Sequence, residues 1–239
     1  MLPSTRATPR PAKLKPVAMN CDEPIAKDIP PPLPQSSFRM LIVAAPGHGK
    51  TSLATSLIIK GGPYYKKFDR VWVIQPNNSR GSYAKDPWAK HSRVFDDLTP
   101  DLLQDIIEQA KKLAEDGKHS LVMIDDFAYT LKDKHIERKL REIYFNSRHL
   151  KLSSVLISQT LRSVPDKLRK SASHLIAFTP ANRIESRIIQ DELLFIDPST
   201  AAVLFDQIFQ DSYDFMLIDT QRRRVFRNLE TEIELPRAF

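Results

Sequence analysis

Apolar and polar positions follow two alternating periods along most of this chain of 239 residues. Short continuous apolar runs, which are typical of strands buried on both faces of a sheet, occur at 40–44, 70–74, 121–124, 154–158 and 174–178. Between these runs, apolar residues recur every three or four positions, as they do on one face of a helix. This succession predicts an α/β fold with a mainly parallel central sheet flanked by helices.

The helical period is clearest in two segments. Residues 101–112 carry leucines and isoleucines at helical spacing, and Thr99 stands where an N-cap is expected. Residues 132–150 repeat the pattern with apolar residues on one face. Shorter helices are expected at 52–60, 182–193 and 198–210, and a final pair of strands near 214–219 and 223–228.

The beginning of the chain differs in composition from the rest, because nine of the 18 prolines precede Gln35. Proline lacks an amide donor and fixes φ, so we expect residues 1–35 to form an extended arm ending in a polyproline-like segment at 30–34. Residues 36–239 are then expected to form one domain. The first twenty residues contain four basic residues and no acid. This arm is either a solvated tail or a segment that docks on a neighbouring subunit or on nucleic acid.

Composition narrows the class of protein. Hydrophobic residues make up 41% and charged residues 27% of the chain, as in ordinary globular domains. The lone cysteine, Cys21, excludes a disulfide framework and suits a reducing compartment. No apolar run reaches the roughly 18 residues that a membrane span needs, and the first residues lack the apolar core of a secretory signal. We therefore expect no stable membrane insertion.

The turn after the first apolar run carries the first chemical signal. Residues 44–51 read AAPGHGKT, which matches the phosphate-binding pattern G-x-x-x-x-G-K-[ST] except that Ala44 replaces the first glycine. Glycines leave room for backbone amides to converge on phosphate oxygens, while the lysine reaches the β and γ phosphates and the threonine hydroxyl binds Mg²⁺. The expected ATP-binding residues are Pro46, Gly47, His48, Gly49, Lys50, Thr51 and Ser52.

Two aspartates end a later apolar run, 121–124. Asp125 is expected to hold Mg²⁺ together with Thr51, and Asp126 to orient and deprotonate the attacking water. The alternative is an Asp-Asp turn that caps the following helix. Their position after a phosphate-binding turn, with a strand and a helix between, favours the nucleotide site.

Gln159 ends the apolar run 154–158. If this strand lies between the two strands that carry the phosphate-binding turn and the aspartates, the fold belongs to the group with an inserted strand and a catalytic acid. A polar residue at the end of that strand then senses the γ-phosphate. A single glutamine at a strand end is also common without such a role.

The order of these motifs resembles the genome-packaging ATPases of large and mid-sized double-stranded DNA viruses, the poxvirus-type branch of the FtsK–HerA superfamily that virophages share. The resemblance covers residues 38–180 and also rests on Asn146-Ser-Arg148-His149, Val164-Pro165 and Ser171-Ala-Ser-His174. It implies a P-loop NTPase fold of the RecA-like, additional-strand catalytic-acid type. It further implies ATP hydrolysis with Mg²⁺ at the interfaces of an oligomeric ring, and translocation of double-stranded DNA into a capsid.

The resemblance also assigns residue roles. The catalytic residues it implies are Lys50, Asp125, Asp126, Gln159 and Arg148. Arg148 stands where superfamily members carry an arginine that acts on the neighbouring subunit's nucleotide, although a cation that stabilises a helix C-terminus is the alternative. Arg169, Arg183 and Arg187 are further candidates for the arginine that acts between subunits.

The basic charge is concentrated in one part of the chain. Lysines and arginines exceed acids by 36 − 29 = +7 overall, and by 11 − 4 = +7 between Leu131 and Lys170 alone. In a ring, loops after the Gln159 strand can face the channel and touch DNA phosphates without reading sequence. The expected DNA contacts are Arg162, Lys167, Arg169 and Lys170, with a solvated basic face as the alternative.

The partners expected from the resemblance are double-stranded DNA, identical subunits in a ring of five or six, and a capsid or portal-vertex protein. The expected location is the host cytoplasm or a virus factory, with association with the virion as a further expectation. Two other interpretations stay open. One is an FtsK–HerA-type pumping ATPase that serves transfer, export or segregation of a mobile element, and the other is a non-motor nucleotide-binding scaffold.

Overall fold

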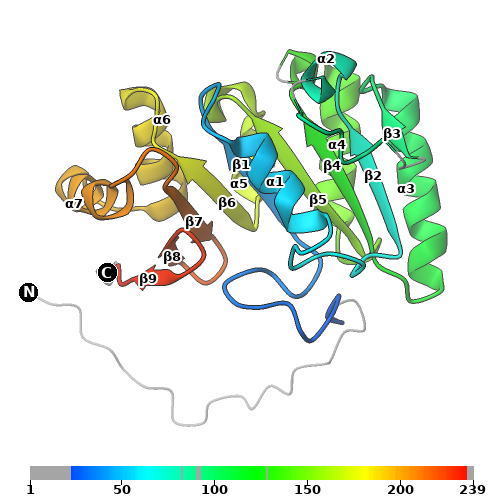
Figure 1. The fold of residues 1–239 in the computed structure, drawn as a ribbon, viewed down its shortest axis with the longest axis horizontal. Helices are drawn as coiled ribbons and strands as arrows, with labels where there is room; N and C mark the ends of the chain where they lie inside the picture. The colour runs from blue at the N-terminus through cyan, green and yellow to red at the C-terminus, as the bar shows by residue number, and fades with distance from the viewer. Residues whose placement is uncertain (1–22, 82, 90–92, 128, 236–239) are drawn as a thin grey trace, which may run out of the picture.

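The computed structural model describes residues 23–81, 83–89, 93–127 and 129–235, and these form one nine-stranded sheet covered by helices (Figure 1). The strand order is β3-β2-β4-β5-β1-β6-β7-β8-β9. The strands are β1 (Arg39–Val43), β2 (Arg70–Ile74), β3 (Val94–Phe95), β4 (Ser120–Asp125), β5 (Leu152–Ser158), β6 (His174–Phe178), β7 (Phe215–Asp219), β8 (Arg224–Arg227) and β9 (Thr231–Ile233).

The helices connect these strands. They are α1 (Lys50–Ile58), α2 (Asn77–Arg80), α3 (Pro100–Glu115), α4 (Lys134–Asn146), α5 (Asp166–Ser171), α6 (Arg183–Arg187) and α7 (Pro198–Ile208), with the 3₁₀ turns η2 (Thr130–Lys132) and η3 (Leu161–Ser163) and the π-helical segment η4 (Ile188–Leu194). Within the described residues, no helix is both long and apolar enough to span a bilayer.

The sheet has a parallel part and an antiparallel part. The strands from β3 to β6 run parallel, whereas β7, β8 and β9 pair antiparallel. β5 pairs with β1 on one side and with β4 on the other. The expected mainly parallel sheet with an inserted strand is therefore confirmed, and so is the final pair of strands.

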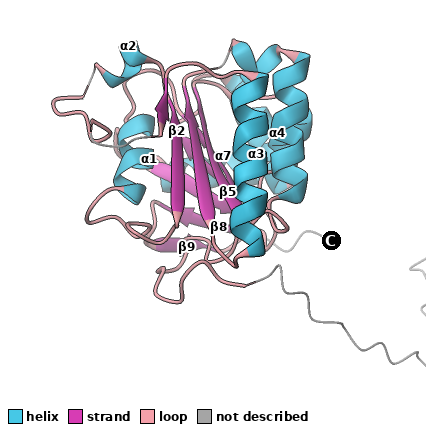
Figure 2. Cartoon of the chain, turned by 90° about the vertical axis from the view of Figure 1, so that its right-hand side faces the viewer, coloured by secondary structure: helices cyan, strands magenta, loops and turns pink. Residues whose placement is uncertain are grey.

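Helices cover both faces of the sheet (Figure 2), and a hydrophobic core lies on each face, which explains why the central strands contain continuous apolar runs. One core holds Trp72 and Ile124 with the apolar faces of α3 and α4. The other holds Val73 and Met123 with α1. Neighbouring residues of one strand therefore enter opposite cores, as the period of two in a strand requires.

The two amphipathic helices begin at side-chain caps, of which Thr99 was expected and Asp133 was not. The Thr99 side chain accepts a hydrogen bond from the amide of Leu102, and Asp133 accepts from the amides of His135 and Ile136. The single helix expected over 182–193 is instead α6 followed by η4, and it ends at Phe195 in the left-handed region (φ 54°). β3 and β9 are too short to leave a recognisable period, so the sequence did not predict them.

Residues 23–35 lie against the domain. Ile29 and Leu33 are buried in the core on the α1 side, and the Tyr64 hydroxyl donates a hydrogen bond to the Pro34 carbonyl (2.9 Å). The amide of Leu33 donates to the Pro30 carbonyl (3.1 Å), so residues 30–33 form a turn instead of the extended segment expected there. The basic first part of the expected arm lies outside the described residues.

Candidate nucleotide-binding site

The phosphate-binding turn joins β1 to the N-terminus of α1 (Figure 1). Gly47 and Gly49 have φ of 82° and 84°, in the left-handed region where glycine alone carries no steric penalty. Ala44 is buried in the sheet and has no positive φ, so its side chain is accommodated where the motif usually has glycine. The expected strand–turn–helix geometry is present, with the amides of the first helical turn free to bind an anion.

Asp125, the last residue of β4, is fully buried beside this turn. Its Oδ2 accepts hydrogen bonds from Thr51 Oγ1 (2.8 Å) and Gln75 Nε2 (3.0 Å). Burial raises the pKa of the carboxyl to about 6; the hydrogen bond from Thr51 opposes this shift, and the nearby charge of Asp126 adds to it. The structure thus brings Thr51 and Asp125, the two expected metal-binding residues, into contact.

Asp126 is exposed and turns out of the strand with φ of 65°, a conformation that aspartate tolerates. Its Oδ1 accepts a hydrogen bond from Gln159 Nε2 (3.1 Å), and its Oδ2 accepts one from Ser79 Oγ (3.1 Å). The residues expected to act as base and as γ-phosphate sensor therefore touch each other. This contact depends on β5 lying next to β4.

Three residues of the site escaped the sequence analysis: Gln75, Ser79 and Tyr83. Gln75 is fully buried at the end of β2, and its Nε2 lies 3.4 Å from the Tyr83 hydroxyl, which in turn pairs with Thr55 Oγ1 (2.9 Å). Since the carboxyl ends of parallel strands meet at one edge of a sheet, a polar residue ending the run 70–74 was a usable signal for Gln75. Ser79 lies in the short helix α2 and Tyr83 in the loop that follows it, and neither segment carries such a signal.

Two buried acceptor oxygens, Asp125 Oδ1 and Gln75 Oε1, have no hydrogen-bond partner among the described residues. Oxygen ligands suit a hard cation such as Mg²⁺, which usually keeps several waters and binds one or two carboxylates together with substrate phosphates. No group of three or more His, Cys, Asp or Glu residues in the described chain forms a metal site by itself. The donor set therefore fits a cation that is bound together with a nucleotide.

Arg148 lies at the other end of the sheet. It is exposed in the turn between α4 and β5, whereas Gln159 follows the last residue of the same strand. The seven residues of β5 separate the two ends by about 20 Å. Arg148 therefore cannot reach the phosphate-binding turn of its own chain, so any role at a nucleotide would require the nucleotide of another subunit.

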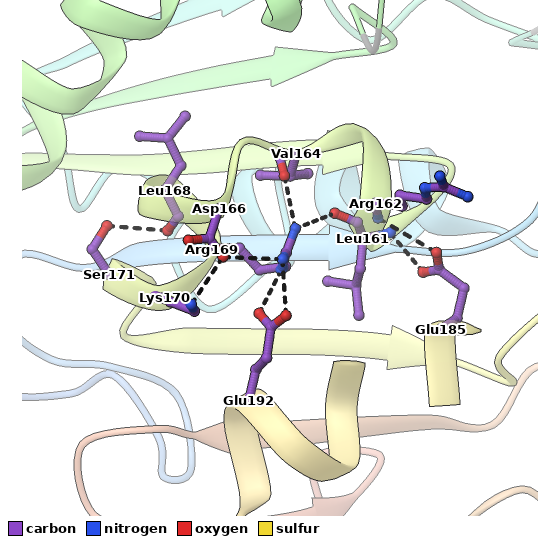
Figure 3. Close-up of polar contacts among 10 residues, drawn as sticks. All are labelled: Leu161, Arg162, Val164, Asp166, Leu168, Arg169, Lys170, Ser171, Glu185 and Glu192. Carbon is purple, nitrogen blue, oxygen red and sulfur yellow. Dashed lines mark hydrogen bonds and ion pairs between the residues drawn. The ribbon is translucent and has the colours of Figure 1, made fainter. Parts of the chain in front are cut away.

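The expectation that Arg169 contacts DNA is wrong. This side chain is only 8% exposed and uses all its N–H donors within the protein (Figure 3). The guanidinium donates to the carbonyls of Leu161 (3.1 Å) and Val164 (2.9 Å), to Asp166 (3.2 Å) and to both carboxylate oxygens of Glu192 (2.9 and 3.0 Å). Arg169 therefore holds η3 and α5 in place, although it lies in a basic stretch of the sequence.

The other expected DNA contacts are exposed. Arg162 lies in η3, three residues after Gln159, and Lys170 lies on α5 (Figure 3). Lys167 also lies on α5. Lys170 forms an ion pair with Asp166 (3.1 Å), but both side chains are largely in solvent, so this pair holds the lysine only weakly. Of these three residues, Arg162 is the closest along the chain to the nucleotide site.

Known structures with a similar fold include viral packaging enzymes. The genome packaging NTPase B204 from Sulfolobus turreted icosahedral virus 2, in complex with AMP, matches with a TM-score of 0.59 and 18% identity over 80% of this chain and 96% of that chain. The DNA-packaging ATPase B204 from Sulfolobus turreted icosahedral virus matches with a TM-score of 0.61 and 17% identity over 80% and 97%.

A more distant match is the cytoplasmic domain of the type VII secretion ATPase EccC from Thermomonospora curvata, with a TM-score of 0.51 and 14% identity over 84% of this chain and 26% of that chain. At these identities the similarity is one of fold, and the fold is that of P-loop NTPases.

No curated protein sequence matches the chain. The family model described as Poxvirus A32 protein matches residues 31–193. Since this match covers more than half of the sequence, the chain belongs to the Poxvirus A32 protein family.

Proposed function

We propose that this chain is the ATPase of a motor that drives double-stranded viral DNA into a preformed capsid. Its family membership supports this function, as does its likeness to structures named genome packaging NTPases, one of them in complex with ATP-gammaS. The observation that carries the proposal is the pair of contacts Thr51–Asp125 and Gln159–Asp126, made where the neighbouring strands β1, β5 and β4 end.

The proposed chemistry is hydrolysis of ATP. The amides of residues 46–52 bind the phosphates, and Lys50 neutralises charge on the β and γ phosphates. Thr51 and Asp125 hold Mg²⁺, which, when bound, offsets the negative charge that develops during phosphoryl transfer. Asp126 orients the attacking water and accepts its proton, and Gln159 senses the γ-phosphate. Ser79 keeps the Asp126 carboxylate in place through the opposite oxygen.

The proposed motor is a homo-oligomeric ring of five or six subunits. Arg148 projects from the edge of the sheet opposite to its own phosphate-binding turn, which supports a role at the nucleotide of a neighbouring subunit. Arg162, Lys167 and Lys170 contact DNA phosphates in the channel. Arg162 lies in η3, only three residues after Gln159. A movement of Gln159 on hydrolysis would therefore also move the proposed DNA contact of Arg162.

The ring docks on a capsid or portal-vertex protein, and its place of work is the host cytoplasm or a virus factory, or the virion itself. These assignments follow from packaging as the function. They are tested by recovery of the chain with capsids from infected cells.

ATP hydrolysis with and without long duplex DNA tests the proposal directly, with Lys50→Ala and Asp126→Asn as matched variants. We expect DNA to stimulate hydrolysis by the wild-type protein only. Lys50→Ala loses ATP binding because the phosphate charge is left uncompensated, whereas Asp126→Asn keeps ATP bound and unhydrolysed because it lacks the base. Hydrolysis that ignores duplex DNA, in preparations that form rings on gel filtration with ATP, would contradict a translocating motor. Hydrolysis by Asp126→Asn at the normal rate would exclude Asp126 as the base.

A further inference from the structure

Tyr213 stands beside the phosphate-binding turn although it is distant in sequence. It lies in the loop between α7 and β7, and β7 runs antiparallel to β6, so this loop reaches the edge of the sheet at which β1 ends (Figure 1). Its Cδ1 atom lies 3.8 Å from the position that a Cβ would take on Gly49. Tyr213 nevertheless stays 70% exposed. A largely exposed aromatic side chain thus lies next to the place where phosphates would bind.

The loop that carries Tyr213 is held in shape by its neighbour Asp214, which is buried. Asp214 Oδ2 accepts hydrogen bonds from the amides of Gln210 (3.1 Å) and Asp211 (2.9 Å) and from Arg227 (2.8 Å), and its Oδ1 accepts one from Asn228 (3.0 Å). A loop fixed in this way loses little conformational entropy when a ligand binds to it. The exposed ring is therefore presented by a preorganised loop.

The polar groups of the site show on which side a nucleoside would lie. Asp125, Asp126 and Gln75 lie on the side of β4 and β2, so the cation and the terminal phosphate belong there. In the strand order β4-β5-β1-β6-β7, the Tyr213 loop stands on the other side of the phosphate-binding turn. A nucleotide that points its terminal phosphate toward Asp126 consequently extends its nucleoside toward Tyr213.

We propose that Tyr213 stacks on the base of the bound nucleotide and positions it, an inference that rests on the proposed ATP-binding function. Aromatic rings stack on every base because each has a π face, so the contact adds affinity for nucleotides in general.

The test is a calorimetric titration with two ligands, the non-hydrolysable ATP analogue AMPPNP and inorganic tripolyphosphate, which has phosphates but no base. We expect Tyr213→Ala to weaken AMPPNP binding by about tenfold or more, the size of one base–aromatic stack, and to leave tripolyphosphate binding within about twofold of wild type. Tyr213→Phe keeps the ring and the affinity. Tyr65→Ala, an exposed tyrosine beyond the far end of α1, is the matched control and changes neither titration.

Three results would overturn the assignment. The first is unchanged AMPPNP affinity in Tyr213→Ala while Lys50→Ala abolishes binding, which leaves the proposed ATPase function intact. The second is an equal loss for AMPPNP and tripolyphosphate, because the ring would then support the turn and not the base. The third is no binding of AMPPNP by the wild-type protein, which would contradict the proposed function as well.

Discussion

At the scale of single residues, Asp125 shows how the site favours its ligand. Its carboxyl is buried, and one oxygen has no hydrogen-bond partner among the described residues. Burial raises its pKa to about 6, so at neutral pH the folded protein holds a charge in an environment that disfavours it. A bound cation would compensate that charge. Under the proposed function, the buried carboxyl lowers the stability of the free protein and adds affinity for a metal-bound nucleotide.

The raised pKa of the buried Asp125 carboxyl predicts that the stability of the protein depends on pH. The pKa of Asp125 rises from 3.8 to about 6 on folding, so its contribution favours the folded state at low pH and is lost as pH rises through 6. A shift of two units corresponds to at most about 3 kcal/mol. We expect Asp125→Asn, which cannot ionise, to be more stable than wild type at pH 8 and to lack this pH dependence.

Denaturant unfolding of the nucleotide-free protein between pH 4 and pH 8 measures the effect, because the pKa change places the loss of stability between about pH 4 and pH 6. Asp126→Asn is the comparison, because Asp126 is exposed and its charge is a smaller cause of the Asp125 pKa shift than burial, so this variant should gain less. Equal unfolding free energies of wild type and Asp125→Asn at pH 8 would show that the buried charge carries no cost.

At the scale of elements, the segment from the end of β5 through α5 combines a rigid part with an exposed one. Arg169 binds the carbonyls at the two ends of η3 and pairs with Glu192 of η4. The Glu185 carboxylate of α6 accepts a hydrogen bond from the amide of Leu161 (2.6 Å) (Figure 3). The turn that follows Gln159 is thus fixed from two neighbouring elements, while Arg162 remains exposed on it.

Because one arginine is buried and the other exposed, substitutions of these two residues, seven positions apart, should change stability by different amounts. Arg169→Met should lower the free energy of unfolding by about 2–4 kcal/mol, because Glu192 loses its partner and two carbonyls lose their donors; the partial exposure of Glu192 limits the loss. Arg162→Met should change stability by no more than about 0.5 kcal/mol. Thermal or denaturant unfolding measures both.

The same pair of variants separates structure from DNA binding. Arg162→Met should weaken binding to duplexes of any sequence and lower the slope of log affinity against log salt by about one. Arg169→Met, studied at a temperature where it is folded, should leave that slope unchanged. A reduced slope for Arg169→Met would restore this residue as a phosphate contact.

At the scale of the whole molecule, different candidate site residues lie at the carboxyl ends and at the amino ends of the parallel strands, here called the carboxyl edge and the amino edge of the sheet. The carboxyl edge carries the phosphate-binding turn, Asp125, Asp126 and Gln159, and the amino edge carries Arg148. A complete site that includes Arg148 therefore needs two copies of the chain. Arg183 and Arg187, also exposed, lie on α6 near the carboxyl edge and are the natural comparisons.

Mixed rings test this arrangement. Arg148→Ala alone should lose turnover but keep ATP affinity, since an arginine acting on the transition state is worth about 10³–10⁵ in rate. Mixing it with Lys50→Ala should restore part of the activity, because some interfaces then combine an intact turn with an intact Arg148. Recovery seen with Arg183→Ala or Arg187→Ala, and absent with Arg148→Ala, would assign the role to that arginine instead.

The local patterns in the sequence predicted most of the fold. Continuous apolar runs mark strands buried on two faces, and the expected cap Thr99 lies at the start of α3. The break of the helix after α6 and the turn at residues 30–33 were not predicted, because the residues there are compatible with more than one backbone conformation and packing decides between them.

The sequence by itself determined that this chain has an α/β fold with a phosphate-binding turn and two aspartates at a strand end, because strand period and motif spacing depend only on neighbouring residues. Only the tertiary structure decided which side chains meet. It brought Gln75 to Asp125 and Tyr213 to Gly49, and it buried Arg169 among its acceptors. Such contacts depend on strand order and on the distances between elements, and a one-dimensional pattern of charge or hydrophobicity carries neither.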